Sequence, residues 1–106
     1  VEGAGGIFVP LNENEMIFDL IKILELPVII VSRSGLGTIN HTCLTINALR
    51  SHNLNIFGVI MNGVPNAENK KAIEHYGKVK VLSEIPQVAD VFMDFAQISE
   101  TRFEKE

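Results

Sequence analysis

Residues 26–40 read Leu-Pro-Val-Ile-Ile-Val-Ser-Arg-Ser-Gly-Leu-Gly-Thr-Ile-Asn, and this stretch decides the fold class. The four residues after Pro27 are β-branched and apolar, without polar alternation, which is typical of a strand buried on both faces of a parallel sheet. We expect this strand at the centre of the sheet. A polar turn with two glycines follows, and Thr38 is the candidate N-cap of a helix over Thr38–Ser51.

The glycine turn between this strand and this helix is a candidate anion site. A helix N-terminus presents free backbone N–H groups and the positive end of the helix dipole, and both favour a negatively charged ligand. The spacing is not a full G-x-G-x-x-G pattern, and most such turns in α/β domains carry no ligand. The spacing alone therefore leaves a ligand open.

Composition places the chain among globular proteins. It has 106 residues, 46% of them hydrophobic and 21% charged, which suits one domain with a real core. The apolar runs are too short for a membrane span, and the N-terminus lacks the basic region of a signal peptide. A net charge of −4 argues against nucleic acid. Cys43 is the sole cysteine, which excludes a disulfide within the chain and fits a reducing, cytoplasmic compartment.

The remaining pattern alternates helices and strands. This order predicts an α/β fold with a doubly wound parallel sheet and flanking helices. In order, we expect a helix over about 14–25, a strand at Asn55–Gly63, a helix from Pro65–Asn69 to about Tyr76, a strand at Lys78–Leu82 with a turn at Ser83–Pro86, and a weak helix at Val91–Ser99.

The chain opens with the glycine-rich Val1–Gly6, which we interpret as a strand end running into a loop. Because a domain rarely begins at the end of a strand, we expect a fragment of a longer protein. Glu2 stands where a carboxylate beside phosphates can hold Mg²⁺. An acid in a solvent-exposed loop fits the sequence equally well.

Several single residues have a structural and a functional interpretation. The amide of Asn62 can read the edge of a base, but spacing alone favours a turn-forming Asn-Gly pair. Cys43 lies on the expected apolar face of its helix, as a small core residue rather than a nucleophile. His41 lies close to any anion at the helix start and has no partner at metal-ligand spacing. Gly58 suggests that a helix packs closely against its strand.

Three stretches together resemble the dethiobiotin synthetases, a family of the P-loop NTPase superfamily. They are Val1–Gly6, then Leu26–Val31 with Gly35–His41, and Gly58–Gly63, with Ile85-Pro86 as a weaker fourth match. The similarity covers about residues 1–90 and corresponds to the C-terminal half of the family pattern. It implies a P-loop NTPase-like fold that here lacks the N-terminal P-loop portion, with residues 1–106 as the C-terminal part of one domain.

The resemblance also implies an activity. In this family CO₂ and 7,8-diaminopelargonate form a carbamate, ATP phosphorylates it, and the neighbouring amine closes the ureido ring of dethiobiotin, a step of biotin biosynthesis. It thus implies a cytoplasmic, ATP- and Mg²⁺-dependent cyclo-ligase that acts as a homodimer on small molecules, without a nucleic-acid or membrane partner.

The resemblance assigns roles to residues of this chain. Glu2 becomes a Mg²⁺ ligand. Gly37, Thr38 and Asn40 offer main-chain N–H groups to the substrate's remote carboxylate, across a dimer interface, and Tyr76 touches substrate after a shift of a residue or two. The residues implied to bind ATP are Glu2, Gly3, Ala4, Gly5, Asn62, Gly63, Pro86, Gln87 and Val88.

Other parts of the family pattern are missing from this sequence. The P-loop lysine, the catalytic lysine and the second acidic Mg²⁺ ligand belong to the N-terminal half of the pattern, so we expect no catalytic residue here and no turnover by this chain alone. Two alternatives remain. One is the nucleotide-binding domain of a cobyrinate or cobyric acid synthetase-type enzyme, for which Cys43 is a poor amidotransferase nucleophile. The other is a non-catalytic dimerisation module of the same fold.

Overall fold

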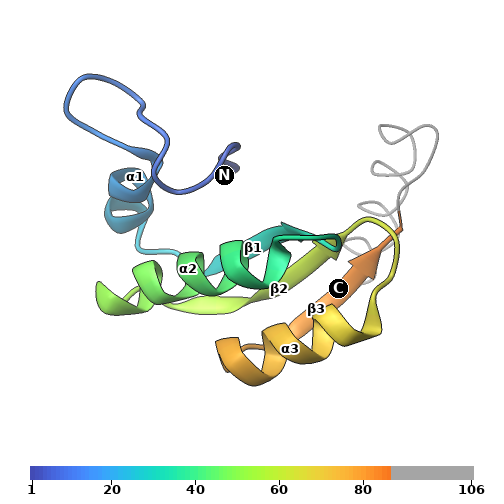
Figure 1. Ribbon diagram of the computed structural model, residues 1–106. Coiled ribbons are helices and arrows are strands. Elements are labelled where there is room, and N and C mark those ends of the chain that lie inside the picture. Colours follow the sequence, from blue (N-terminus) through green and yellow to red (C-terminus); the bar gives the residue numbers. More distant parts are fainter. Residues whose placement is uncertain (87–106) are drawn as a thin grey trace, which may run out of the picture.

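A three-stranded parallel sheet lies at the centre of the computed structural model, which describes residues 1–86. The strands stand in the order β1-β2-β3, with helices beside them (Figure 1). This arrangement confirms the expected α/β class with a parallel sheet and flanking helices. The elements are α1 (Ile17–Leu24), β1 (Val28–Arg33), α2 (Thr38–Ser51), β2 (Ile56–Asn62), α3 (Ala67–Gly77) and β3 (Val81–Ile85).

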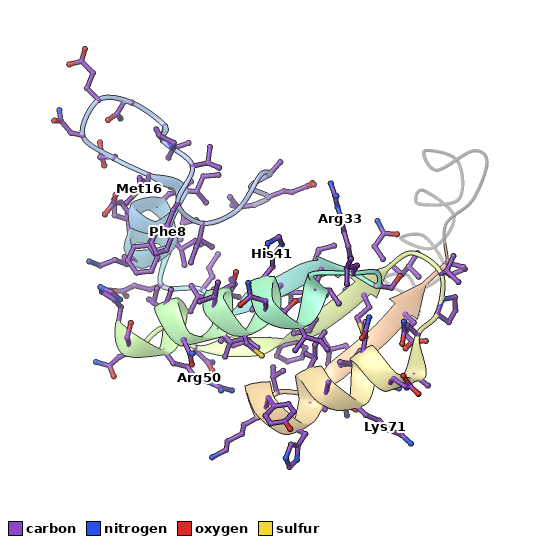
Figure 2. The ribbon with its side chains drawn as sticks, viewed as in Figure 1. Phe8, Met16, Arg33, His41, Arg50 and Lys71 are labelled. Carbon is purple, nitrogen blue, oxygen red and sulfur yellow. The ribbon has the colours of Figure 1, made fainter. Side chains whose placement is uncertain are left out.

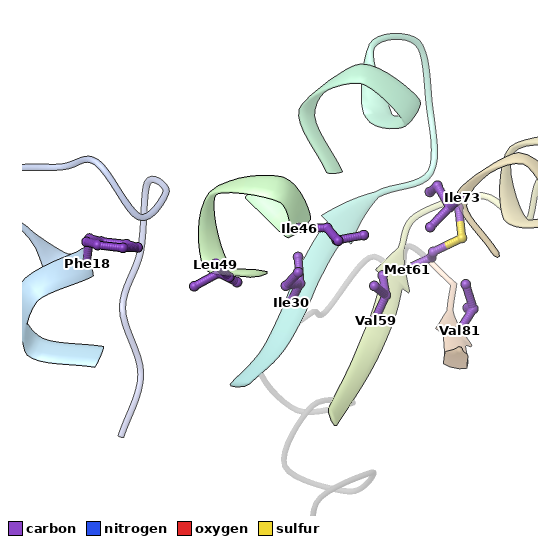
Figure 3. Close-up of a cluster of buried hydrophobic side chains, with 8 residues drawn as sticks. All are labelled: Phe18, Ile30, Ile46, Leu49, Val59, Met61, Ile73 and Val81. Carbon is purple, nitrogen blue, oxygen red and sulfur yellow. The ribbon is translucent and has the colours of Figure 1, made fainter. Parts of the chain in front are cut away.

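Helices α2 and α3 cover the same face of this sheet. Right-handed crossovers between strands in the order β1-β2-β3 place both connecting helices on one side. Side chains from both helices and all three strands meet in one cluster beneath them (Figure 3). Its buried members on these elements are Ile30, Ile46, Leu49, Val59, Met61, Ile73 and Val81.

The opposite face of the sheet is open within residues 1–86. Ile29 is 47% exposed and Val31 66% exposed, so the expectation that β1 is buried on both faces is wrong for the described part of the chain. The physical reason is that α2 and α3 lie on the other side, while α1 lies beyond the end of the sheet (Figure 1). β1 is also an edge strand in this sheet, and β2 is the central one.

Gly58 allows a close approach between two strands, not between helix and sheet as expected. A Cβ on Gly58 would lie 2.6 Å from Cγ of Leu82 on β3. Because side chains alternate along a strand and Val81 points into the core, Leu82 lies on the open face. The glycine thus lets Leu82 lie across β2.

Two of the expected element boundaries shift. The helix expected from about residue 14 begins at Ile17, because Asn12 Oδ1 accepts hydrogen bonds from the N–H groups of Asn14 and Glu15, both at 2.9 Å, and holds these residues in a turn. The strand expected at Lys78–Leu82 is β3, which begins later and includes Ser83–Ile85.

A left-handed residue explains the shift of β3. Lys78, with φ 47°, ends α3 as its C-cap, so an extended strand cannot begin there. The strand end expected at the start of the chain is also wrong, since Val1 and Glu2 are in no strand. The helix expected over Val91–Ser99 lies outside the described residues.

The bounds of α2 agree with the sequence, and its buried face combines apolar with polar side chains. The buried residues are Thr38, Thr42, Ile46 and Leu49, whereas Leu44 is exposed. Thr38 and Thr42 satisfy each other through a hydroxyl–hydroxyl hydrogen bond of 3.3 Å, which lets two polar side chains occupy core positions. Of the helices within residues 1–86, none has both the length and the apolar character that a membrane span requires.

Candidate functional site

Two strand-to-helix turns lie side by side at the carboxyl edge of the sheet. The last residues of β1 and β2, Arg33 and Asn62, are register partners. The turn after Arg33 leads into α2 and the turn after Asn62 leads into α3 (Figure 1). Ligands of open α/β sheets bind at this edge, so the two turns form the candidate site.

The N-terminus of α2 is uncapped. Its N-cap is Gly37, with φ 92° and ψ −11°, and no side chain accepts a hydrogen bond from the first turn. The expectation that Thr38 is the N-cap is therefore wrong: Thr38 is the first helical residue, and its hydroxyl is directed to Thr42 in the core. The left-handed backbone at Gly37 disfavours a side chain there.

Few backbone hydrogen bonds close this first turn. Thr38 N–H donates to the Gly35 carbonyl at 3.2 Å, and His41 N–H donates to the Gly37 carbonyl at 3.0 Å. Among the described residues, the N–H groups of Ile39 and Asn40 have no such acceptor. An uncapped helix start with free N–H groups is suited to an anion.

A cavity of about 530 Å³ opens at this helix start, within the range of small-molecule sites. It brings together the predicted substrate residues Gly37, Thr38 and Asn40. Cys43, expected in the core, is half-buried and lines this cavity. The full lining is Gly35, Leu36, Gly37, Thr38, Ile39, Asn40, Cys43 and Asn69.

His41 lies beside the same helix start, as the sequence indicates. A Cβ on Gly37 would lie 3.9 Å from His41 Cε1, and the imidazole extends away from the sheet (Figure 2). The ring thus lies beside Gly37, but His41 is not among the residues that line the cavity.

The structure brings together three of the residues predicted to bind the nucleotide. Asn62 pairs in register with Ile85, next to Pro86, and Gly63 N–H donates to the Ile85 carbonyl at 2.8 Å. Asn62 and Pro86 are both exposed, so their surface is open to a ligand. The other two residues predicted on this side, Gln87 and Val88, lie outside the described part of the chain.

The glycine-rich start of the chain does not line the cavity. Glu2, Gly3, Ala4 and Gly5 are exposed, and a Cβ on Gly3 would lie 3.1 Å from Cγ2 of Ile17 on α1. Within residues 1–86, no group of three or more His, Cys, Asp or Glu side chains is arranged to hold a metal ion. Glu2 alone still fits Mg²⁺ chemistry, because this ion is usually bound by one or two carboxylates with water and phosphate oxygens.

Tyr76 is not near the cavity. It lies near the C-terminal end of α3, is 73% exposed and contacts the His75 ring at 4.8 Å between centroids. The cavity meets α3 at Asn69 in its first turn, two helical turns away. The substrate role of Tyr76 stays a prediction.

Asn69 lines the cavity and was not identified by sequence reasoning, and neither was its partner Ser34. Asn69 Nδ2 donates to the Ser34 carbonyl at 2.8 Å and joins α3 to the turn before α2. No local pattern connects two polar residues 35 positions apart, so only the tertiary structure identifies this contact.

Comparison with known proteins adds the family. A family model described as AAA domain matches residues 1–93, and the chain belongs to this family. The chain is 55% identical over 85 residues to the ATP-dependent dethiobiotin synthetase BioD of Paramagnetospirillum magneticum, and the match covers 80% of this chain and 42% of that protein.

Other relatives have similar names. The BioD protein of Lawsonia intracellularis, also an ATP-dependent dethiobiotin synthetase, is 48% identical over 91 residues, or 86% of this chain and 45% of its own length. The biotin biosynthesis bifunctional protein BioCD of Bordetella avium is 56% identical over 88 residues, or 83% of this chain and 19% of that protein. The chain thus spans less than half of each of these relatives, and its resemblance to dethiobiotin synthetases is confirmed.

Proposed function

We propose that this member of the AAA domain family is the C-terminal part of an ATP-dependent dethiobiotin synthetase, a ligase of biotin biosynthesis. The observation that carries the proposal is the 55% identity to an enzyme of that name, over 85 residues. The full-length protein joins 7,8-diaminopelargonate and CO₂ as a carbamate, ATP phosphorylates the carbamate oxygen, and attack by the second amine closes the ureido ring with release of phosphate.

The uncapped start of α2 binds the remote carboxylate of 7,8-diaminopelargonate in this proposal. The geometry that supports it is the cavity at Gly37 and the free N–H groups of Ile39 and Asn40. Thr38 contributes less through its main chain than expected, because its N–H already donates to the Gly35 carbonyl. The helix dipole favours a carboxylate at the same point.

The nucleotide occupies the neighbouring turn. Asn62 hydrogen-bonds the edge of adenine, Pro86 borders the base, and Glu2 contributes one carboxylate to Mg²⁺, which neutralises phosphate charge when bound. The exposed pair of Asn62 and Pro86 on adjacent strand ends supports the base site. We further propose that the enzyme is a cytoplasmic homodimer.

An activity assay of the full-length protein tests this proposal. Purified protein is incubated with 7,8-diaminopelargonate, bicarbonate, Mg²⁺ and ATP, and dethiobiotin is measured by mass spectrometry; we expect formation that requires ATP and no turnover by residues 1–106 alone. Absence of dethiobiotin would overturn the proposal. Glutamine-dependent amidation of a corrinoid carboxylate would instead support the cobyric acid synthetase alternative.

A further inference from the structure

We infer that Asn69 is a positioning residue for the substrate: from α3 it fixes the orientation of the turn that precedes α2. The inference rests on the proposed function, since it concerns the carboxylate site. Asn69 Nδ2 donates to the Ser34 carbonyl at 2.8 Å, and the contact is part-buried. It joins the first turn of α3 to the strand-to-helix turn before α2.

The backbone of Asn69 is itself held in place. Its backbone N–H donates to Oδ1 of Asn66, the N-cap of α3, at 3.0 Å. Asn69 is therefore fixed in the first turn of a capped helix. Its part-buried carboxamide therefore extends from a fixed point of α3 to the Ser34 carbonyl.

The turn is also held from a second side. Ser34 is 6% exposed, and a Cβ on Gly63 would lie 2.5 Å from Ser34 Oγ. Ser34 is thus enclosed between Gly63, which follows the predicted adenine residue Asn62, and Asn69. Ser34 is thus the residue at which the two turns of the site are in contact.

This contact sets the direction of a backbone donor. The Ser34 carbonyl and the Gly35 N–H belong to one planar trans peptide unit, so they point in opposite directions. Fixing the carbonyl toward Asn69 turns the Gly35 N–H away from α3. Gly35 and Asn69 both line the cavity at the start of α2, so Asn69 acts on the site through the turn.

The test compares Asn69 variants of the full-length protein with wild type. Asn69→Asp keeps the shape but cannot donate to the Ser34 carbonyl, and Asn69→Ala removes the side chain. We expect both variants to raise the KM for 7,8-diaminopelargonate about tenfold, because each loses one hydrogen bond that orients the binding turn. The KM for ATP should change less than about twofold.

A substrate analogue separates positioning from general damage. The monomethyl ester of 7,8-diaminopelargonate lacks the remote charge, so we expect wild type and Asn69→Ala, which adds no charge to the cavity, to bind it with equal affinity. Arg50→Ala is the matched control, because Arg50 donates to the Gly77 and Lys78 carbonyls at the far end of α3 and its loss weakens the helix without touching the turn. We expect Arg50→Ala to lower the melting temperature and leave both KM values unchanged.

Amide hydrogen exchange gives a readout that does not depend on the substrate. Asn69→Asp should speed exchange in residues 34–38 about tenfold and leave β2 unchanged. Unchanged exchange there, or equal rises in both KM values, would overturn the inference. The wild-type protein could show no synthetase activity while Asn69→Asp still speeds amide exchange in the turn. That result would overturn the proposed function but would support the contact between Asn69 and the turn.

Discussion

The helices that follow β1 and β2 start side by side at one edge of the sheet, but only one of them has a side-chain cap for the N–H groups of its first turn. α3 begins with Asn66, whose side chain accepts from the third-position N–H, and it carries Glu68 in its first turn. α2 begins with Gly37, has no side-chain cap and has no acid in its first turn.

In our proposal, the difference separates a structural helix end from one that binds the substrate. The Asn66 side chain accepts from the N–H of Asn69, and Glu68 places a negative charge beside the positive end of the α3 dipole, so this end is less suited to an external anion. The N-cap of α2 is Gly37, so this end forgoes only about a few tenths of a kcal/mol relative to an Asn or Asp cap. An external carboxylate can supply that stabilisation, which is the role we propose for the substrate.

The largest expected effect comes from giving α2 an internal anion. Gly37→Asp should weaken binding of 7,8-diaminopelargonate about 100-fold, because the new carboxylate competes for the same N–H groups and repels the substrate. ATP binding should be largely spared. Isothermal titration calorimetry of the full-length protein with each ligand measures both effects.

Gly37→Asn is the control for this change. Asparagine has the same shape without the charge and tolerates the left-handed backbone better than most residues. We expect a smaller loss of substrate affinity than with Gly37→Asp. Equal loss of substrate and ATP binding in Gly37→Asp would count against the carboxylate assignment.

A second change disturbs the contact between the turns. Gly63→Ala should lower the free energy of unfolding by about 2–3 kcal/mol, since its Cβ would lie 2.5 Å from Ser34 Oγ at a backbone φ of 138°. Urea denaturation measures this loss. The control is Gly35→Ala, whose Cβ would meet no atom within 4 Å; a loss as large at Gly35 would contradict the close fit at Gly63.

The smallest expected effect comes from uncapping α3. Asn66→Ala removes the acceptor for Asn69 N–H and should cost about 1 kcal/mol of stability, which thermal unfolding detects. Asn66→Ser keeps an acceptor and should stay near wild type. In our proposal the N-terminus of α3 binds no anion, so the KM for 7,8-diaminopelargonate should change far less in Asn66→Ala than in Gly37→Asp. A comparable rise in this KM would contradict the proposed difference between the two helix N-termini.

The sequence predicted the elements well where a local signal existed. The apolar run at 28–31 fell within β1, and the helical periodicity after the glycine turn gave α2 its bounds at Thr38–Ser51. Where the signal was ambiguous the prediction failed. Thr38 has the chemistry of an N-cap, but tertiary packing buries it against Thr42, and the neighbouring glycine takes the cap position.

The site was predicted only in part, for a related reason. Motif resemblance predicts a substrate role for Gly37 and Asn40, and both residues line the cavity at the start of α2. It could not identify Asn69, whose partner Ser34 is distant in sequence. Nor could it assign the surroundings of Tyr76, which depend on how α3 lies across the sheet.

The sequence by itself determined the parallel α/β class, the positions of most elements and the family, because apolar runs, glycine turns and motif order are local properties of the chain. The tertiary structure alone decided which face of β1 is covered, which residues of α2 are buried and how the two turns are joined through Ser34. These three features depend on contacts between segments far apart in the sequence. The direction of the helix crossovers decides which face of β1 is covered, and the composition of the strand does not.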